Sequence, residues 1–182
     1  MGRAASAARD RGEGGVMDDR VERAALRGEI EELVVENAFL LDRGRFAELV
    51  DLYTEDCEVT RLLPPFTDGR YETVCGRAAL AKSFADPATW PPSPRTMRHV
   101  LANLRLEPRS PNEVGATLTW TGYRHEGEGM SVSIPMAVGD YEDEYRRDAD
   151  GRWRIRKRRI IIAFLNRDLL EQATAATRGK AG

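Results

Sequence analysis

Residues 140–159 read DYEDEYRRDADGRWRIRKRR, and this stretch predicts a β-hairpin. Its centre, Asp148 to Gly151, has the composition of a tight turn. An acidic run, Asp140 to Glu144, precedes the turn, and a basic run, Arg152 to Arg159, follows it at a matching distance. Folding at the turn places acids opposite bases, and such cross-strand pairs contribute roughly 0.2–1 kcal/mol each. We therefore interpret the basic run as a sheet face, with Arg159 as the partner of Asp140, and not as a nucleic-acid site.

Period-two alternation of apolar and polar residues continues on the N-terminal side of the hairpin and predicts further strands. The long strands are expected at Met97–Glu107, Val114–His125, Ser131–Arg147 and Arg152–Leu165. Earlier in the chain the apolar period is 3.6 residues, which predicts helices. These helices are expected at Asp18–Leu41, Phe46–Tyr53 and Gly76–Phe84, with a short strand at Cys57–Leu62 and a short closing helix from Asn166. Helices followed by a long antiparallel sheet indicate an α+β fold.

The length of 182 residues, 41% of them hydrophobic, is that of one domain. Residues 1–15 contain no aromatic or branched aliphatic side chain, so they bury too little surface to offset their ordering entropy. We expect a disordered extension over residues 1–17, one domain over residues 18–170, and a polar tail over residues 171–182.

Composition excludes several classes of protein. The 28 Lys and Arg nearly balance the 30 Asp and Glu, which argues against a nucleic-acid partner. The cysteines, Cys57 and Cys75, are too few for a disulfide framework, and the histidines, His99 and His125, are too few for the usual zinc or iron sites. No apolar run approaches the ~20 residues that span a bilayer. We expect a cytoplasmic protein with no metal, cofactor, nucleic-acid partner or membrane association.

Asp42 is the first polar residue that interrupts an apolar pattern. It continues the inward face of the first helix, eight residues after Val34, at a C-terminus where the helix dipole disfavours an anion. A carboxylate there needs a partner. One alternative is a salt bridge to Arg43 or Arg45, and the other is a role in a polar site.

His99 is the second such residue. By alternation it shares one strand face with Met97, Leu101 and Asn103. A histidine among apolar neighbours is either a satisfied core group or a general base suited to neutral pH. Asn103 adds a second polar group to the same predicted face, which favours a site there.

Aromatic side chains complete the candidate set. Tyr53 ends the apolar stripe of the second helix, and Tyr123 lies in a long strand; either hydroxyl could polarise a carbonyl, although both could also be core residues. Trp120 and His125 join Asn103 and Tyr123 as substrate-binding candidates, while solvent exposure is the alternative for His125. The sequence has no nucleophile elbow, phosphate-binding loop or dinucleotide fingerprint. His99, Asp42 and Tyr53 are therefore the catalytic candidates, in a set suited to moving a proton next to a carbonyl or hydroxyl.

Three passages of the sequence resemble the SnoaL-like branch of the NTF2-like superfamily. The first is ENAFLLDRGRF at residues 36–46 with LYTEDCEV at residues 52–59, and the second is RHVLANLRL at residues 98–106. The third is YEDEY at residues 141–145 with GRWRI at residues 151–155. Together they span roughly Val21 to Leu165 in the order and spacing of the family.

The resemblance implies an α+β cone, in which a bent antiparallel sheet and N-terminal helices enclose a pocket. It implies acid–base chemistry without a cofactor, as in dehydratases similar to scytalone dehydratase, isomerases similar to ketosteroid isomerase, and polyketide cyclases. In the dehydratase-like members an Asp that ends the first helix faces a His of the second passage, and these correspond to Asp42 and His99. The expected ligand is an apolar small-molecule substrate, and the expected assembly is a homodimer or homotrimer.

The same passages also resemble the β subunits of ring-hydroxylating dioxygenases, which share this fold and are chiefly structural and trimeric. A non-catalytic oxygenase β subunit is therefore one alternative function, and a small-molecule binding module is another. Co-purification with an iron–sulfur partner would distinguish the oxygenase subunit from the enzyme.

Overall fold

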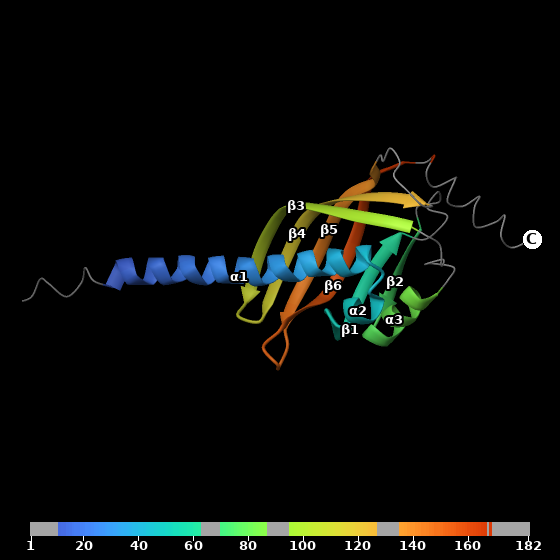
Figure 1. The fold of residues 1–182 in the computed structure, drawn as a ribbon. Helices are drawn as coiled ribbons and strands as arrows, with labels where there is room; N and C mark the ends of the chain where they lie inside the picture. The colour runs from blue at the N-terminus through green and yellow to red at the C-terminus, as the bar shows by residue number, and fades with distance from the viewer. Residues whose placement is uncertain (1–10, 63–69, 87–94, 127–134, 167, 169–182) are drawn as a thin grey trace, which may run out of the picture.

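A computed structural model describes residues 11–62, 70–86, 95–126, 135–166 and 168 (Figure 1). The helices in these ranges are α1 (Arg11–Asp42), α2 (Phe46–Val50) and α3 (Arg77–Ala85). The strands are β1 (Tyr53–Leu62), β2 (Tyr71–Cys75), β3 (Arg95–Ser110), β4 (Glu113–Glu126), β5 (Pro135–Arg147) and β6 (Trp153–Leu165). Figure 1 shows α1 lying along the curled sheet, with α2 and α3 at the end where β1 and β2 lie.

The six strands form one sheet in the order β2-β1-β6-β5-β4-β3. The fold is an NTF2-like α+β cone, as predicted, but the sheet is mixed: β1 pairs with β6 in parallel, while the other neighbours are antiparallel. The predicted antiparallel pairing therefore holds for every pair of neighbours except β1 and β6, because the sequence pattern did not place β1 beside the last strand. The sequence analysis also missed β2, whose five residues show no clear apolar alternation, and it extended the second helix to Tyr53, which begins β1.

Helix α1 covers the sheet. Its buried face carries Ile30, Leu33, Val34, Asn37 and Leu40 at three- and four-residue spacing, as the periodicity predicted. Gly44 ends the helix with φ of +66°, the left-handed conformation that glycine adopts without steric cost. The helix begins at Arg11, within the stretch expected as an extension; residues 1–10, most of the predicted closing helix and the predicted tail lie outside the described residues. None of the helices in the described ranges is long and apolar enough to cross a membrane.

The hairpin of β5 and β6 pairs acids with bases. Glu142 lies opposite Arg159, Asp143 opposite Arg158, and Glu144 opposite Lys157, which confirms the predicted cross-strand arrangement. The predicted pair of Asp140 with Arg159 is wrong. Asp140 lies opposite Ile161, because the strands shift register between Glu144 and Tyr145, and Asp140 accepts a hydrogen bond from Thr119.

Two bulges change which side chains face the interior. In β3 the register shifts between Ala102 and Arg105, and Asn103 adopts a φ of 57°. In β6 Lys157 and Ile155 lie opposite consecutive residues of β5, so Arg156 is the extra residue. An extra residue moves every later side chain to the other face of a strand. The β3 bulge turns Asn103 outward, and the β6 bulge turns Arg158 inward.

Candidate active site

A cavity of about 240 Å³ lies between the helices and the sheet. Its wall is mostly apolar, with side chains such as Leu49, Leu80, Met97 and Ile160. The polar groups on this wall include His99, Tyr53, Asn37 and Arg158. An apolar cavity with a few convergent polar groups is typical of small-molecule sites.

His99 and Asp42 form a buried pair on this wall. The carboxylate of Asp42, at the end of α1, lies 2.6 Å from Nδ1 of His99 and accepts a second hydrogen bond, of 2.9 Å, from the backbone N–H of His99. The two side chains are only 7% and 6% exposed. Since the helix C-terminus disfavours an anion, these two donors from β3 hold the carboxylate in place.

The protonation state of Asp42 determines the direction of its hydrogen bond with the His99 ring. Burial raises the pKa of Asp42, but the hydrogen bonds and the charge of His99 outweigh burial, and the pKa lies below its usual value. An ionised carboxylate only accepts, so Nδ1 of His99 carries the proton that points to Asp42. The other ring nitrogen, Nε2, is then left for a molecule in the cavity.

The alternative partners of Asp42 are engaged elsewhere. Arg45 makes an ion pair with Glu48 on α2, and Arg43 lies over the ring of Phe39 and donates to its carbonyl. The geometry therefore favours the polar-site interpretation of Asp42 over the surface salt bridge.

A second polar group, which we call the interior row, consists of Tyr53, Asn37, Arg158, Asp143 and Tyr145. Arg158 donates from Nε and Nη2 to the two oxygens of Asp143, at 2.9 and 2.7 Å, and from Nη1 to Oδ1 of Asn37 at 2.6 Å. Asn37 Nδ2 lies 3.2 Å from the Tyr53 hydroxyl, and the Tyr145 hydroxyl donates to Asp143 at 2.6 Å. All five residues are buried.

Two aromatic rings connect the pair to the interior row. Trp120 stacks on Tyr141 with centroids 5.5 Å apart, and its centroid is 6.0 Å from that of His99. The guanidinium carbon of Arg158 lies 4.2 Å from the centroid of Tyr141. Trp120 and Tyr53 therefore lie in the cavity wall with His99, where the sequence analysis had grouped them.

Three predicted binding residues do not line the cavity. Asn103 is exposed, because the bulge reverses its face, and its Nδ2 lies 3.5 Å from Thr119 Oγ1. Tyr123 and His125 lie opposite Arg98 and Thr96 on β3 and are absent from the cavity wall. Residues three apart on a strand face opposite sides, so Tyr123 lies on the other face of β4 from Trp120.

Asn37, Arg158 and Tyr141 line the cavity, although sequence reasoning did not select them. Arg158 was assigned to a charged sheet face with its neighbours, and its neighbours Arg159 and Lys157 do pair with acidic side chains in that way. The available signal was the polar residue at the inward position 37 of α1, which needs a partner when buried. No group of three or more His, Cys, Asp or Glu side chains suited to a metal ion occurs among the described residues.

Residues 22–159 match the family described as the SnoaL-like domain. None of the curated proteins matches the chain. Among solved structures, the chain is similar to a candidate scytalone dehydratase from Novosphingobium aromaticivorans, with a TM-score of 0.65, 19% identity, and coverage of 79% of this chain and 88% of that one.

Two further solved structures have the same fold. ActVI-ORFA from Streptomyces coelicolor has a TM-score of 0.64 and 20% identity over 76% of this chain and 98% of its own. The β subunit of a candidate aromatic-ring-hydroxylating dioxygenase from Novosphingobium aromaticivorans has a TM-score of 0.63 and 17% identity, over 80% of this chain and 94% of its own. At these identities the likenesses establish the fold alone.

Proposed function

The chain belongs to the SnoaL-like domain family, and we propose that it is a cofactor-independent acid–base enzyme acting on a small apolar carbonyl or hydroxyl compound. The reaction would be of the dehydratase, isomerase or polyketide-cyclase type. The observation that carries the proposal is the buried pair of His99 and Asp42 on the wall of an apolar cavity. This pair supplies the group that such chemistry needs, a base of fixed orientation.

The proposed reaction starts with proton abstraction. Nε2 of His99 takes a proton from the carbon beside a carbonyl, and the electron pair left behind moves onto the carbonyl oxygen as an enolate. Asp42 stabilises the imidazolium formed, and the Tyr53 hydroxyl donates a hydrogen bond to the oxygen. Return of the proton to another carbon completes an isomerisation. Its transfer to a departing hydroxyl releases water and completes a dehydration.

The experiment uses a panel of cyclic ketones in heavy water, in which proton abstraction appears as deuterium beside the carbonyl. His99→Gln should exchange at least about 100-fold more slowly than wild type, since general acid–base catalysis contributes about 10²–10⁴. His125→Gln is the matched control, because His125 does not line the cavity. A panel of β-hydroxyketones then tests for loss of water. Equal rates in wild type and His99→Gln, for compounds that wild type turns over, would remove His99 from the mechanism.

A non-catalytic oxygenase β subunit is the second candidate, and the observation that favours it is the fold shared with the dioxygenase subunit. It predicts co-purification of a larger iron–sulfur protein with a tagged copy expressed in the native host. We propose a homodimer or homotrimer in either case, and light scattering of the purified chain would measure its mass.

A further inference from the structure

The hydrogen bonds of the interior row have a fixed direction. A guanidinium has N–H donors and no acceptor, so the atom of Asn37 that lies 2.6 Å from Arg158 Nη1 must be the amide oxygen. The bidentate pair with Asp143 holds the guanidinium in turn. Arg158 therefore determines which way the Asn37 side chain points.

The direction is transmitted to Tyr53. With its oxygen on Arg158, Asn37 presents Nδ2 to the Tyr53 hydroxyl at 3.2 Å. The Tyr53 oxygen thus accepts a hydrogen bond from Asn37, and its own proton must point elsewhere. Among the described residues that proton has no acceptor, and Tyr53 lies in the cavity wall. A molecule in the cavity is the acceptor that this geometry leaves.

We propose that Arg158 and Asn37 are positioning residues that hold Tyr53 as a hydrogen-bond donor toward the cavity, so that the bound compound presents an acceptor oxygen, such as a carbonyl, to Tyr53. The inference rests on the proposed function and deepens it by naming the residues that fix the direction of the Tyr53 hydroxyl. The cavity then has two complementary sides. His99 offers an acceptor nitrogen for the proton to be moved, and Tyr53 offers a donor for the oxygen on which charge develops.

The interior row also prepares Tyr53 for a negatively charged oxygen. Burial raises the pKa of Tyr53, so its hydroxyl stays protonated and able to donate, while the charge of Arg158 and the hydrogen bond from Asn37 act in the opposite direction. A buried donor beside a guanidinium suits an oxygen that becomes an enolate. A bound group without an acceptor atom would leave the Tyr53 proton without a partner, at the cost of a lost hydrogen bond.

The first test needs neither a ligand nor turnover. Difluorotyrosine, whose hydroxyl ionises near neutral pH, replaces Tyr53, and fluorine NMR follows its titration. If Asn37 donates, Asn37→Leu removes a bond that stabilises the ionised form, and the pKa should rise by about one to two pH units. Asn112→Leu, in the exposed turn between β3 and β4, is the matched control and should leave the pKa unchanged. A fall in Asn37→Leu would mean that Asn37 accepts from Tyr53, and either a fall or no change overturns the proposal.

The second test uses acetophenone with an isotope-labelled carbonyl, which has an acceptor and no donor. Binding to wild type or to His99→Gln should lower the infrared stretching frequency of this carbonyl. Binding to Tyr53→Phe should not lower it. Binding to Asn37→Asp should not lower it either, because a carboxylate accepts from both Arg158 and Tyr53 and reverses the hydroxyl. Affinity for acetophenone should fall about tenfold in both variants. The proposal is overturned if the carbonyl frequency in Tyr53→Phe equals that in wild type, or if wild type shows no saturable binding of acetophenone. A lowered frequency that is retained in His99→Gln separates the role of Tyr53 from that of His99.

Discussion

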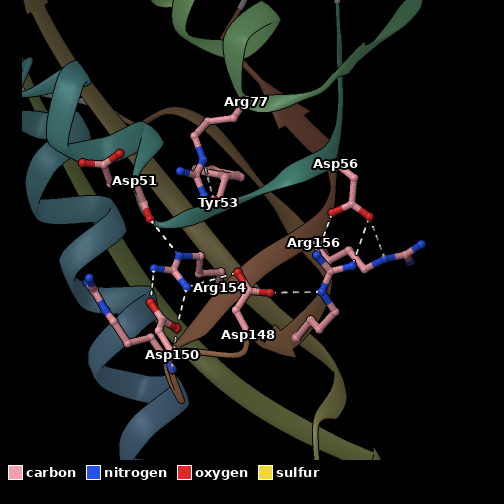
Figure 2. A network of polar contacts seen from close by, with 10 residues as sticks. Asp51, Tyr53, Asp56, Arg77, Asp148, Asp150, Arg154 and Arg156 are labelled. Atoms are coloured by element: carbon pink, nitrogen blue, oxygen red, sulfur yellow. Dashed lines mark hydrogen bonds and ion pairs between the residues drawn. The ribbon is translucent and has the colours of Figure 1, made fainter.

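The hairpin of β5 and β6 carries two groups of arginine–aspartate pairs in opposite environments. In the interior row, the side chains of Arg158 and Asp143 are 3% and 0% exposed. The other group, which we call the turn network, contains Asp56, Arg146, Asp148, Asp150, Arg154 and Arg156. Figure 2 shows Arg154 between Asp148 and Asp150, and Arg156 beside Asp56. Arg146 donates to both oxygens of Asp56, at 3.0 and 2.8 Å, much as Arg158 does to Asp143.

The geometry of the two groups is alike, so the difference between them comes from burial. Arg146 and Asp56 are 31% and 54% exposed, and water screens their attraction. Arg158 and Asp143 lose their hydration in full, which makes the pair costly to form and more costly to break. A protein gains little stability from such a buried pair, so its presence beside a cavity points to the positioning of Asn37 and Tyr53.

The largest effect is expected from Arg158→Met. It leaves the carboxylate of Asp143 buried without its cation, and loss of one partner of a buried pair costs about 3–5 kcal/mol of unfolding free energy. Urea unfolding measures the loss. Arg146→Met is the matched variant on the same hairpin, and equal losses in the two variants would contradict the distinction between the groups.

Replacing the whole buried pair should recover most of that loss. The triple variant Arg158→Met, Asp143→Leu, Tyr145→Phe removes the charges together with the hydroxyl that donates to Asp143, and apolar replacement of buried pairs is often neutral or stabilising. The Tyr53 hydroxyl should still lose its fixed orientation toward the cavity in this variant. Recovered stability together with wild-type acetophenone binding would show that the interior row has no positioning role.

A smaller effect is expected from Arg146→Met by itself. Exposed pairs contribute about 0–1 kcal/mol, so its unfolding free energy should fall by about 1 kcal/mol or less, and the difference from wild type should shrink further in high salt. A salt-independent loss of several kcal/mol would place Arg146 in the same class as Arg158.

The smallest effect concerns Asp56 in acid. Its hydrogen bonds from Arg146 lower the pKa of Asp56 from 3.8 to about 2. Because the folded-state pKa is depressed, the stabilisation is complete above 3.8 and is lost as the pH falls toward about 2. The unfolding free energies of wild type and Asp56→Asn should converge over this interval. If the two unfolding free energies diverged in acid, the ionised carboxylate of Asp56 would be shown to destabilise the fold.

The sequence patterns predict most of the helices and strands, but not which residues of each strand face the interior. Alternation located β3 to β6, and periodicity located α1, because both patterns are local. The bulges at Asn103 and Arg156 have one trace in the sequence, because apolar residues change from odd to even positions beyond each of them. The prediction of continuous strands did not take this change into account. That change placed Asn103 outside the cavity and Arg158 inside it. The pairing of Asp42 with His99 joins residues far apart in the chain, and it was anticipated through the family resemblance together with two polar interruptions of apolar patterns.

The central claim is that Asp42 holds the His99 ring with Nε2 free to accept a proton from a molecule in the cavity. Nitrogen NMR of the ring in isotope-labelled protein, at mildly alkaline pH, tests this claim directly. We predict a proton on Nδ1 and none on Nε2, and loss of that preference in Asp42→Asn. A neutral ring with its proton on Nε2, indifferent to Asp42→Asn, would contradict the claim, because His99 would then have no acceptor nitrogen to offer the cavity.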